Sequence, residues 1–163
     1  MMKKIYYHVF LIAEHKYLIG ATYKGLAFVG SRDKGIDELR EFYDCQLVDS
    51  IDQVRPYVEQ LTEYLNGTRQ QFDLSIDITG TPFQEDVWKT LQSIPYGTVT
   101  NYTEIAQSIG RPKASRAVGT AIGKNPLLMV IPCHRVLTKS GKLGGYRGGL
   151  GMKQALLKLE QNN

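Results

Sequence analysis

Residues 101–123 read NYTEIAQSIGRPKASRAVGTAIG and decide how the second half of the chain is organised. Asn101 is a favourable N-cap residue, Glu104 follows it by three positions, and apolar residues then recur at helical spacing. The Gly-Arg-Pro break at 110–112 ends this helix, because glycine permits a turn and proline favours the start of a second helix. We therefore expect two short helices, the second over 113–123, in a helix-turn-helix. Helical hairpins that never meet DNA share this pattern, so it does not by itself assign a partner.

The second of these helices is built almost entirely from small residues. Arg116 is the one long side chain inside it, and Gly119 costs roughly 1 kcal/mol relative to alanine in a helix interior. Small residues allow another backbone to approach closely. That backbone belongs either to the protein's own core or to a nucleic acid.

Charge is distributed unevenly along the chain. The formal net charge is +4 at pH 7, but residues 1–80 carry −3 and residues 81–163 carry +7. Residues 105–159 contain ten Lys or Arg and no acid, with Glu104 and Glu160 standing just outside. A surface of one sign attracts polyanions and releases their counterions on contact, which favours nucleic acid as a partner. An ordinary solvated basic face is the alternative.

The two halves separate near residue 78. Residues 81–84 (TPFQ) combine an N-cap threonine, a proline at the first helical position and a capping-box glutamine. An apolar helical face follows, and we expect Trp88 on it to pack in the core. The domains expected are therefore 1–77, with a structural role, and 78–163, with the basic surface.

The N-terminal half predicts a mixed α/β (α+β) domain. Runs rich in β-branched and aromatic residues indicate a small antiparallel sheet, and apolar periodicity indicates helices. The expected strands lie at 5–13, 17–22, 26–29 and 72–78, and the expected helices at 37–43 and 54–65.

Composition limits the class of protein. No run approaches the roughly 18 apolar residues of a membrane span, so we expect a soluble cytoplasmic protein. Its cysteines are Cys45 and Cys133, which an intracellular chain keeps reduced. Cys45 lies beside Asp44 in an acidic stretch that disfavours its thiolate. Two Cys and three scattered His give no metal-ligand spacing, so no metal is expected.

The surroundings of Cys133 differ from ordinary core sequence. An apolar run at 127–131, expected to form a buried strand, ends in PCHRV at 132–136. A free cysteine has a pKa near ~8.5, and neighbouring cations lower that pKa and enrich the thiolate. His134 and Arg135 therefore make Cys133 a candidate nucleophile.

These residues carry a resemblance to a known family. PCHRV resembles the active-site signature of the O6-alkylguanine-DNA alkyltransferases, the methylated-DNA–protein-cysteine S-methyltransferases. The likeness extends through TPFQEDVWKTLQSIPYGTVTNYTEIA, RPKASRAVG, GKNP and SGKLGGYRGGLGMKQALLKLE, over residues 81–160. It implies a mostly helical, winged-helix-like C-terminal domain that binds DNA and transfers alkyl groups.

The resemblance implies how DNA is bound. The family's helix-turn-helix enters the minor groove of duplex DNA, and the damaged nucleotide rotates out of the stack at a cost of about a few kcal/mol. Arg116 matches the arginine finger that fills the gap in the stack. The other DNA-facing positions implied are Ser115, Ala117, Gly119 and Thr120.

The resemblance also implies a chemistry. The thiolate of Cys133 attacks the alkyl carbon on O6 of guanine, after His134 has taken the thiol proton through a water and with Glu160 orienting the imidazole. Tyr102 matches the tyrosine that donates a proton to guanine N3. The supporting and pocket positions implied are Asn125 in the turn beneath the thiol, the carbonyls of Cys133 and Val136, the N–H of Arg147, and Tyr146 in the loop over the pocket.

The implied product is a thioether, which does not release its alkyl group, so one molecule repairs one lesion and needs no cofactor. The implied partner is double-stranded DNA containing O6-alkylguanine, with O4-methylthymine as a further substrate and the protein acting as a monomer. Leu128, a proline in some relatives, and Arg147, a small residue in others, are departures expected to change the pocket width.

Two other functions fit some of these features. A sensor or regulator would use the helix-turn-helix to mark lesions without removing the alkyl group. Alkyltransferase-like relatives of that kind carry tryptophan at the position of Cys133, which disfavours this alternative. A cysteine hydrolase is the third hypothesis, but such enzymes usually bring Cys and His together from distant parts of the chain.

Overall fold

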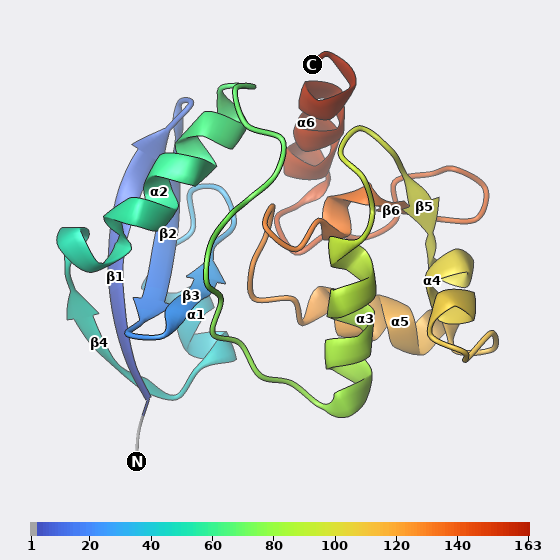
Figure 1. Cartoon of the computed structure of the whole chain (residues 1–163), viewed down its shortest axis with the longest axis horizontal. Helices are drawn as coiled ribbons and strands as arrows, with labels where there is room; N and C mark the ends of the chain where they lie inside the picture. The colour runs from blue at the N-terminus through green and yellow to red at the C-terminus, as the bar shows by residue number, and fades with distance from the viewer. Residues whose placement is uncertain (1–2) are drawn as a thin grey trace. The chain divides into compact units, whose positions relative to one another are not determined.

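The computed structural model describes residues 3–163 (Figure 1). The chain divides into two compact units, Met1–Ile78 and Thr79–Asn163. No helix among the described residues is long and apolar enough to cross a membrane.

The described part of the first unit is a four-stranded sheet with two helices. Its elements are β1 (Lys3–Ile12), β2 (His15–Thr22), β3 (Gly25–Val29), α1 (Ile36–Phe42), β4 (Cys45–Asp49) and α2 (Ile51–Leu65). The strand order is β3-β2-β1-β4, in which β1, β2 and β3 are antiparallel and β4 runs parallel to β1. The antiparallel strands and both helices confirm the sequence predictions. The sequence did not predict β4, because only Cys45 of its five residues is buried and its pattern gives little alternation.

The helix α2 buries the apolar stripe that the sequence indicated. Val54, Leu61 and Tyr64 on it are fully buried. The helix ends before Gly67, whose φ of +80° lies in the left-handed region that glycine adopts without strain.

The predicted strand at 72–78 is wrong. The segment is extended, but it forms only a single isolated bridge, between Ile76 and Leu26 of β3. The N–H of Leu26 donates to the carbonyl of Ser75 at 2.9 Å, and that of Asp77 donates to Leu26 at 2.8 Å. Alternating apolar residues report which side chains turn inward, and here they are partly buried without a ladder of backbone pairs.

The second unit is mostly helical, with one small sheet. Its elements are α3 (Pro82–Gln92), β5 (Thr100–Asn101), α4 (Tyr102–Ser108), α5 (Ser115–Gly123), the single 3-10 turn η1 (Cys133–Arg135), β6 (Val136–Leu137) and α6 (Leu150–Gln161). The two short strands β5 and β6 pair in parallel. The helices α4 and α5 confirm the predicted helix-turn-helix, and both α3 and α4 pack on α5.

The local signals that start these helices work as the sequence predicted. The hydroxyl of Thr81 accepts from the N–H of Gln84 at 3.1 Å, and the Gln84 side chain accepts from the N–H of Thr81 at 3.0 Å. The side chain of Asn101 caps α4 by accepting from the N–H of Glu104 at 2.9 Å. Trp88 lies in the core, only 3% exposed, and its indole N–H donates to the carbonyl of Ala121 at 2.9 Å.

Candidate active site

The segment just before Cys133 is a turn and not a strand. The predicted strand at 127–131 is wrong: the N–H of Ile131 donates to the carbonyl of Leu127 at 3.0 Å, and Met129 has a φ of +72°. The side chain of Asn125 holds this turn from within, because Oδ1 accepts from the N–H of Leu127 at 2.9 Å and Nδ2 donates to the carbonyl of Ile131 at 2.9 Å. An apolar run with an asparagine before it therefore folds back on itself and remains buried.

Asn125 also contacts the thiol directly. Its Nδ2 donates to Sγ of Cys133 at 3.3 Å, and Cys133 is only 2% exposed. Burial raises the pKa of the Cys133 thiol, and the hydrogen bond from Asn125 together with the positive charges of Arg147 and Lys153 offsets part of that rise. The balance leaves a thiol that needs a base or a nearby charge to ionise at neutral pH.

The expectation that His134 and Arg135 supply the charge beside the thiol is wrong. Both side chains are directed to Glu160 on α6, so the cations that lower the pKa of Cys133 are Arg147 and Lys153. The prediction assumed that neighbours in the chain lie beside the sulfur. It failed because successive side chains of a 3-10 turn point in different directions.

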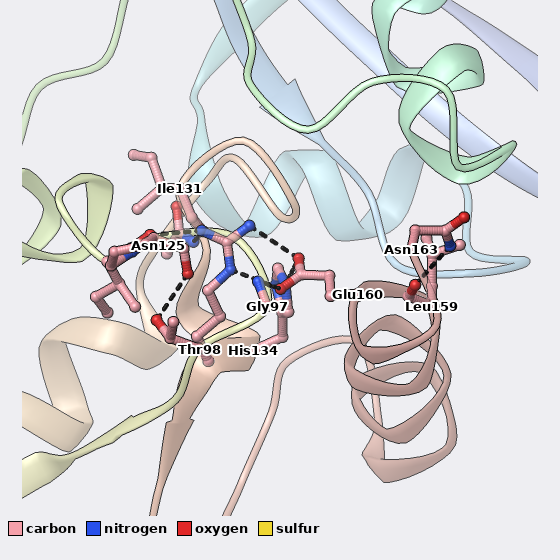
Figure 2. A network of polar contacts seen from close by, with 11 residues as sticks. Gly97, Thr98, Asn125, Ile131, His134, Leu159, Glu160 and Asn163 are labelled. Atoms are coloured by element: carbon pink, nitrogen blue, oxygen red, sulfur yellow. Dashed lines mark hydrogen bonds and ion pairs between the residues drawn. The ribbon is translucent and has the colours of Figure 1, made fainter.

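His134, Arg135 and Glu160 form a buried polar cluster. Figure 2 shows His134 and Glu160 of this cluster. Nε2 of His134 lies 2.6 Å from Oε2 of Glu160, and Glu160 also accepts from Nε of Arg135 at 2.8 Å and Nη2 at 2.9 Å. The N–H of Gly97 donates to Oε1 of Glu160 at 3.3 Å. Burial lowers the pKa of His134, although the hydrogen bond and charge of Glu160 act in the opposite direction, so the imidazole is neutral at neutral pH.

Tyr102, at the first position of α4, is partly buried on the thiol's side of the unit. Burial raises the pKa of its hydroxyl, and the negative charge of an ionised Cys133 raises it further. Tyr102 therefore stays protonated and is able to donate. Gly144 lies against it, since a Cβ built there would come within 2.9 Å of the tyrosine Oη.

The helix α5 has one buried face and one face open to solvent. Val118, Ala121 and Ile122 are buried, whereas Arg116 is exposed. The other predicted DNA-facing residues are Ser115 and Gly119, partly buried, and Ala117 and Thr120, exposed. Packing does not require a glycine at 119, because a Cβ there would meet the ring of Tyr102 at an ordinary 3.8 Å. The protein's own core therefore does not explain the glycine at this position.

No group of three or more His, Cys, Asp or Glu residues able to hold a metal ion occurs within residues 3–163. Cys45, the second thiol, is buried in the first unit, and that burial raises its pKa. The charge of Asp44 also raises the pKa of Cys45, whereas Arg40 and Lys3 lower it.

Comparisons with known proteins decide the family. Residues 82–162 match the family model described as "6-O-methylguanine DNA methyltransferase, DNA binding domain". An inducible methylated-DNA–protein-cysteine methyltransferase of Bacillus subtilis is 45% identical over 162 residues, covering 96% of this chain and 90% of that protein. The chain belongs to the methylated-DNA–protein-cysteine methyltransferase family.

Solved structures of this methyltransferase family share the whole fold. The crystal structure of the Mycobacterium tuberculosis O6-methylguanine methyltransferase superposes with a TM-score of 0.84 at 37% identity, covering 97% of this chain and 93% of that one. A complex of the M. tuberculosis protein with DNA gives a TM-score of 0.80 at 36% identity, with 98% and 93% covered.

Sequence analysis missed one residue whose charge acts on Cys133. Lys153 on α6 is fully buried, and its Nζ donates to the carbonyls of Val136 at 2.7 Å, Gly145 at 3.2 Å and also Leu143. Burial lowers its pKa to about 8. The signal was available, because Lys153 shares one helical face with Leu156 and Glu160, at spacings of three and seven residues.

The segment 138–149, here called the lid loop, is fastened at two points. Lys153 holds the carbonyls of Leu143 and Gly145, and Arg147 donates from Nε at 3.3 Å and Nη2 at 3.0 Å to the backbone carbonyl of Asn125. Tyr146, also predicted here, is partly buried in the loop. The carbonyl of Val136, which the family resemblance assigns to base recognition, is the one that Lys153 holds.

Proposed function

We propose that this protein repairs DNA by moving the alkyl group of O6-alkylguanine, in duplex DNA, onto its own Cys133. The observation that carries the proposal is the thiol hydrogen-bonded by Asn125 next to a neutral His134 paired with Glu160, in a chain of this family. The same reaction extends to O4-methylthymine, whose alkyl group is also attached to an exocyclic oxygen.

The reaction is a displacement at the alkyl carbon. A bond forms between Sγ of Cys133 and that carbon, the carbon–O6 bond breaks, and its electron pair moves into the purine. His134 takes the thiol proton through a water, and because Nε2 is engaged with Glu160 this exchange runs through Nδ1. Tyr102, protonated at neutral pH, donates to guanine N3 so that neutral guanine leaves.

Base recognition uses the lid loop and the strand beside the cysteine. The carbonyls of Cys133 and Val136 and the N–H of Arg147 bind the edge of the extruded base, and Tyr146 covers it. Because Cys133 is only 2% exposed, residues around the sulfur have to move before a base reaches it.

The C-terminal domain, 78–163, binds DNA through α5. Arg116, exposed on this helix, enters the duplex and fills the gap left by the extruded base, while Ser115, Ala117, Gly119 and Thr120 allow close approach to the groove. The net charge of +7 over residues 81–163 supplies contacts to phosphate. The N-terminal domain, 1–77, has a structural role.

Because the thioether on Cys133 is stable, each protein molecule reacts only once. The alkyl donor is the DNA itself, so no cofactor takes part, and the site of action is the cytoplasmic DNA. This sets the protein apart from a turnover enzyme and from a lesion sensor.

A titration tests the proposal. Fixed amounts of duplex carrying one O6-methylguanine are incubated with increasing wild-type protein, Cys133→Ser or the matched control Cys45→Ser, and the remaining lesion is measured. We expect one lesion removed per molecule for wild type and Cys45→Ser, and none for Cys133→Ser. Binding of lesion DNA by wild type without loss of the methyl group would favour the sensor, and removal of many lesions per molecule would favour a turnover enzyme.

A further inference from the structure

Arg135 belongs to the signature around the nucleophile, yet its side chain does not act on the sulfur. Its Nε donates to Oε1 of Glu160 at 2.8 Å, and Nη2 donates to Oε2 at 2.9 Å. Nη1 donates to the carbonyl of Ile94 at 2.6 Å, and the guanidinium lies 5.6 Å from the centre of the Tyr96 ring. The guanidinium is therefore fixed on all sides and paired with both oxygens of one carboxylate.

The pairing determines how Glu160 meets His134. Oε2 of Glu160 is shared between Nη2 of Arg135 and Nε2 of His134, at 2.9 Å and 2.6 Å. A bidentate arginine–carboxylate pair fixes the plane of the carboxylate as well as its position. Glu160 is therefore presented to the imidazole in one orientation.

The pairing also determines the charge that His134 experiences. An uncompensated buried carboxylate beside an imidazole would favour imidazolium, because each charge stabilises the other in a medium of low dielectric. The other charged group that acts on the imidazole is the cation of Lys153. Tyr96, beside Arg135, is neutral because burial raises its pKa. Arg135 is the cation that directly contacts Glu160.

We propose that Arg135 is a positioning residue that keeps His134 a neutral base by neutralising and orienting Glu160. An imidazole that already carries a proton is unable to accept one from the thiol, so Glu160 without Arg135 would slow the reaction that it is placed to assist. The inference rests on the proposed alkyl transfer, and it assigns to Arg135 a role exerted through Glu160. Burial is the main cause that lowers the pKa of His134, and the positive charge of Arg135 lowers it further, in the direction that the geometry requires.

The test compares Arg135→Met, which removes both the positive charge and the two hydrogen bonds to Glu160, with Arg135→Lys, which keeps the charge. The rate of methyl transfer from lesion duplex is measured from about pH 5 to about pH 9, and the protonation of His134 is followed by nitrogen NMR of its ring. For Arg135→Met we expect the midpoint of His134 to move to higher pH and transfer at the acid end to slow by about tenfold. Arg135→Lys should keep a midpoint close to that of wild type. The control is Arg55→Met, an exposed arginine of α2, which should change neither quantity.

The double variant Arg135→Met/Glu160→Gln makes the test specific. If Arg135 acts through Glu160, replacing the carboxylate by an amide cancels the upward shift, so the double variant and Glu160→Gln should have the same His134 midpoint. A folded Arg135→Met with the wild-type midpoint would overturn the inference. If Arg135→Met does not fold, Arg135→Gln, which is polar but removes the charge, takes its place, and a folded glutamine variant with the wild-type midpoint would overturn the inference. A wild-type protein that transfers no methyl group would refute the proposed function, and the NMR midpoints would still test the role of Arg135.

Discussion

Nδ2 of Asn125 lies 3.3 Å from Sγ of Cys133, while the backbone carbonyl of the same asparagine accepts two hydrogen bonds from the guanidinium of Arg147. One residue thus joins the thiol to the lid loop. Because Nδ2 also holds the turn through Ile131, a disturbance at Asn125 reaches the nucleophile, its turn and the loop together.

Replacing Asn125 by alanine should impair both reaction and folding. The turn loses its internal hydrogen bonds, at a cost of about 1–3 kcal/mol in the free energy of unfolding. The pKa of Cys133 rises further, because the hydrogen bond that lowers it is gone, so the alkylation rate should reach its plateau at higher pH. Urea unfolding and the pH–rate profile measure the two effects, with the exposed Asn66→Ala of the first unit as control. An unchanged pH–rate profile in a destabilised variant would limit Asn125 to a structural role.

Replacing Arg147 by serine should change two properties, the pKa of Cys133 and the attachment of the lid loop to Asn125. Its positive charge lowers the pKa of Cys133, so its loss raises that pKa, reduces the thiolate at a given pH and moves the alkylation curve to higher pH. We expect alkylation about fivefold slower at neutral pH, corresponding to ~1 kcal/mol. Amide exchange in the lid loop should become faster, because both bonds to Asn125 are lost. Lys139→Ser, an exposed residue of the same loop, is the control, and equal behaviour of the two variants would argue against a special role for Arg147.

Tyr102→Phe should slow transfer while leaving DNA binding intact. The ring remains in place beside Gly144, but the protonated hydroxyl that donates to the leaving base is absent. General-acid catalysis is worth between about 100-fold and about 10,000-fold, so single-turnover transfer should slow within that range. Affinity for lesion duplex, measured in parallel, should stay within a factor of about two, since no phosphate contact is removed. A variant with the wild-type transfer rate would exclude Tyr102 as the proton donor.

Arg116→Ala should slow repair of duplex DNA without changing the rate of alkyl transfer from a free base. Arg116 is exposed on α5 and has no part in the polar cluster around Glu160, so reaction with free O6-benzylguanine should hardly change. Repair of a lesion in duplex DNA should slow several-fold, because the extruded base is no longer replaced in the stack. Equal losses with both substrates would show that Arg116 is needed for folding.

The sequence predicted best where local signals determine the structure. The caps at Thr81 and Asn101 and the break at 110–112 act within a few residues. The helices α3 and α4 begin at their predicted caps, whereas α5 begins at Ser115, two residues after the predicted start at Lys113. The strand predictions at 72–78 and 127–131 failed for a shared reason. Apolar pattern reports burial, whereas a strand also needs a partner for its backbone, and that partner is not local.

Long-range geometry accounts for what the sequence missed at the site. Proximity along the chain suggested that His134 and Arg135 flank the sulfur, but both side chains point to Glu160, twenty-six and twenty-five residues away. Lys153, twenty residues from Cys133, supplies part of the charge instead. The direction of a side chain from a 3-10 turn depends on the packing of α6, which sequence spacing alone does not give.

Mass mapping of the protein after one reaction tests the central claim most directly. Wild-type protein is mixed with duplex containing one O6-methylguanine and digested with trypsin, which places Cys133 in the peptide 125–135 and Cys45 in the peptide 41–69. We expect a methyl group in place of the thiol hydrogen of Cys133, seen as the added mass of one CH2 in its peptide, no change at Cys45, and unmodified guanine recovered in the DNA. A methylene on any other residue, or a methyl group still on the guanine, would contradict it.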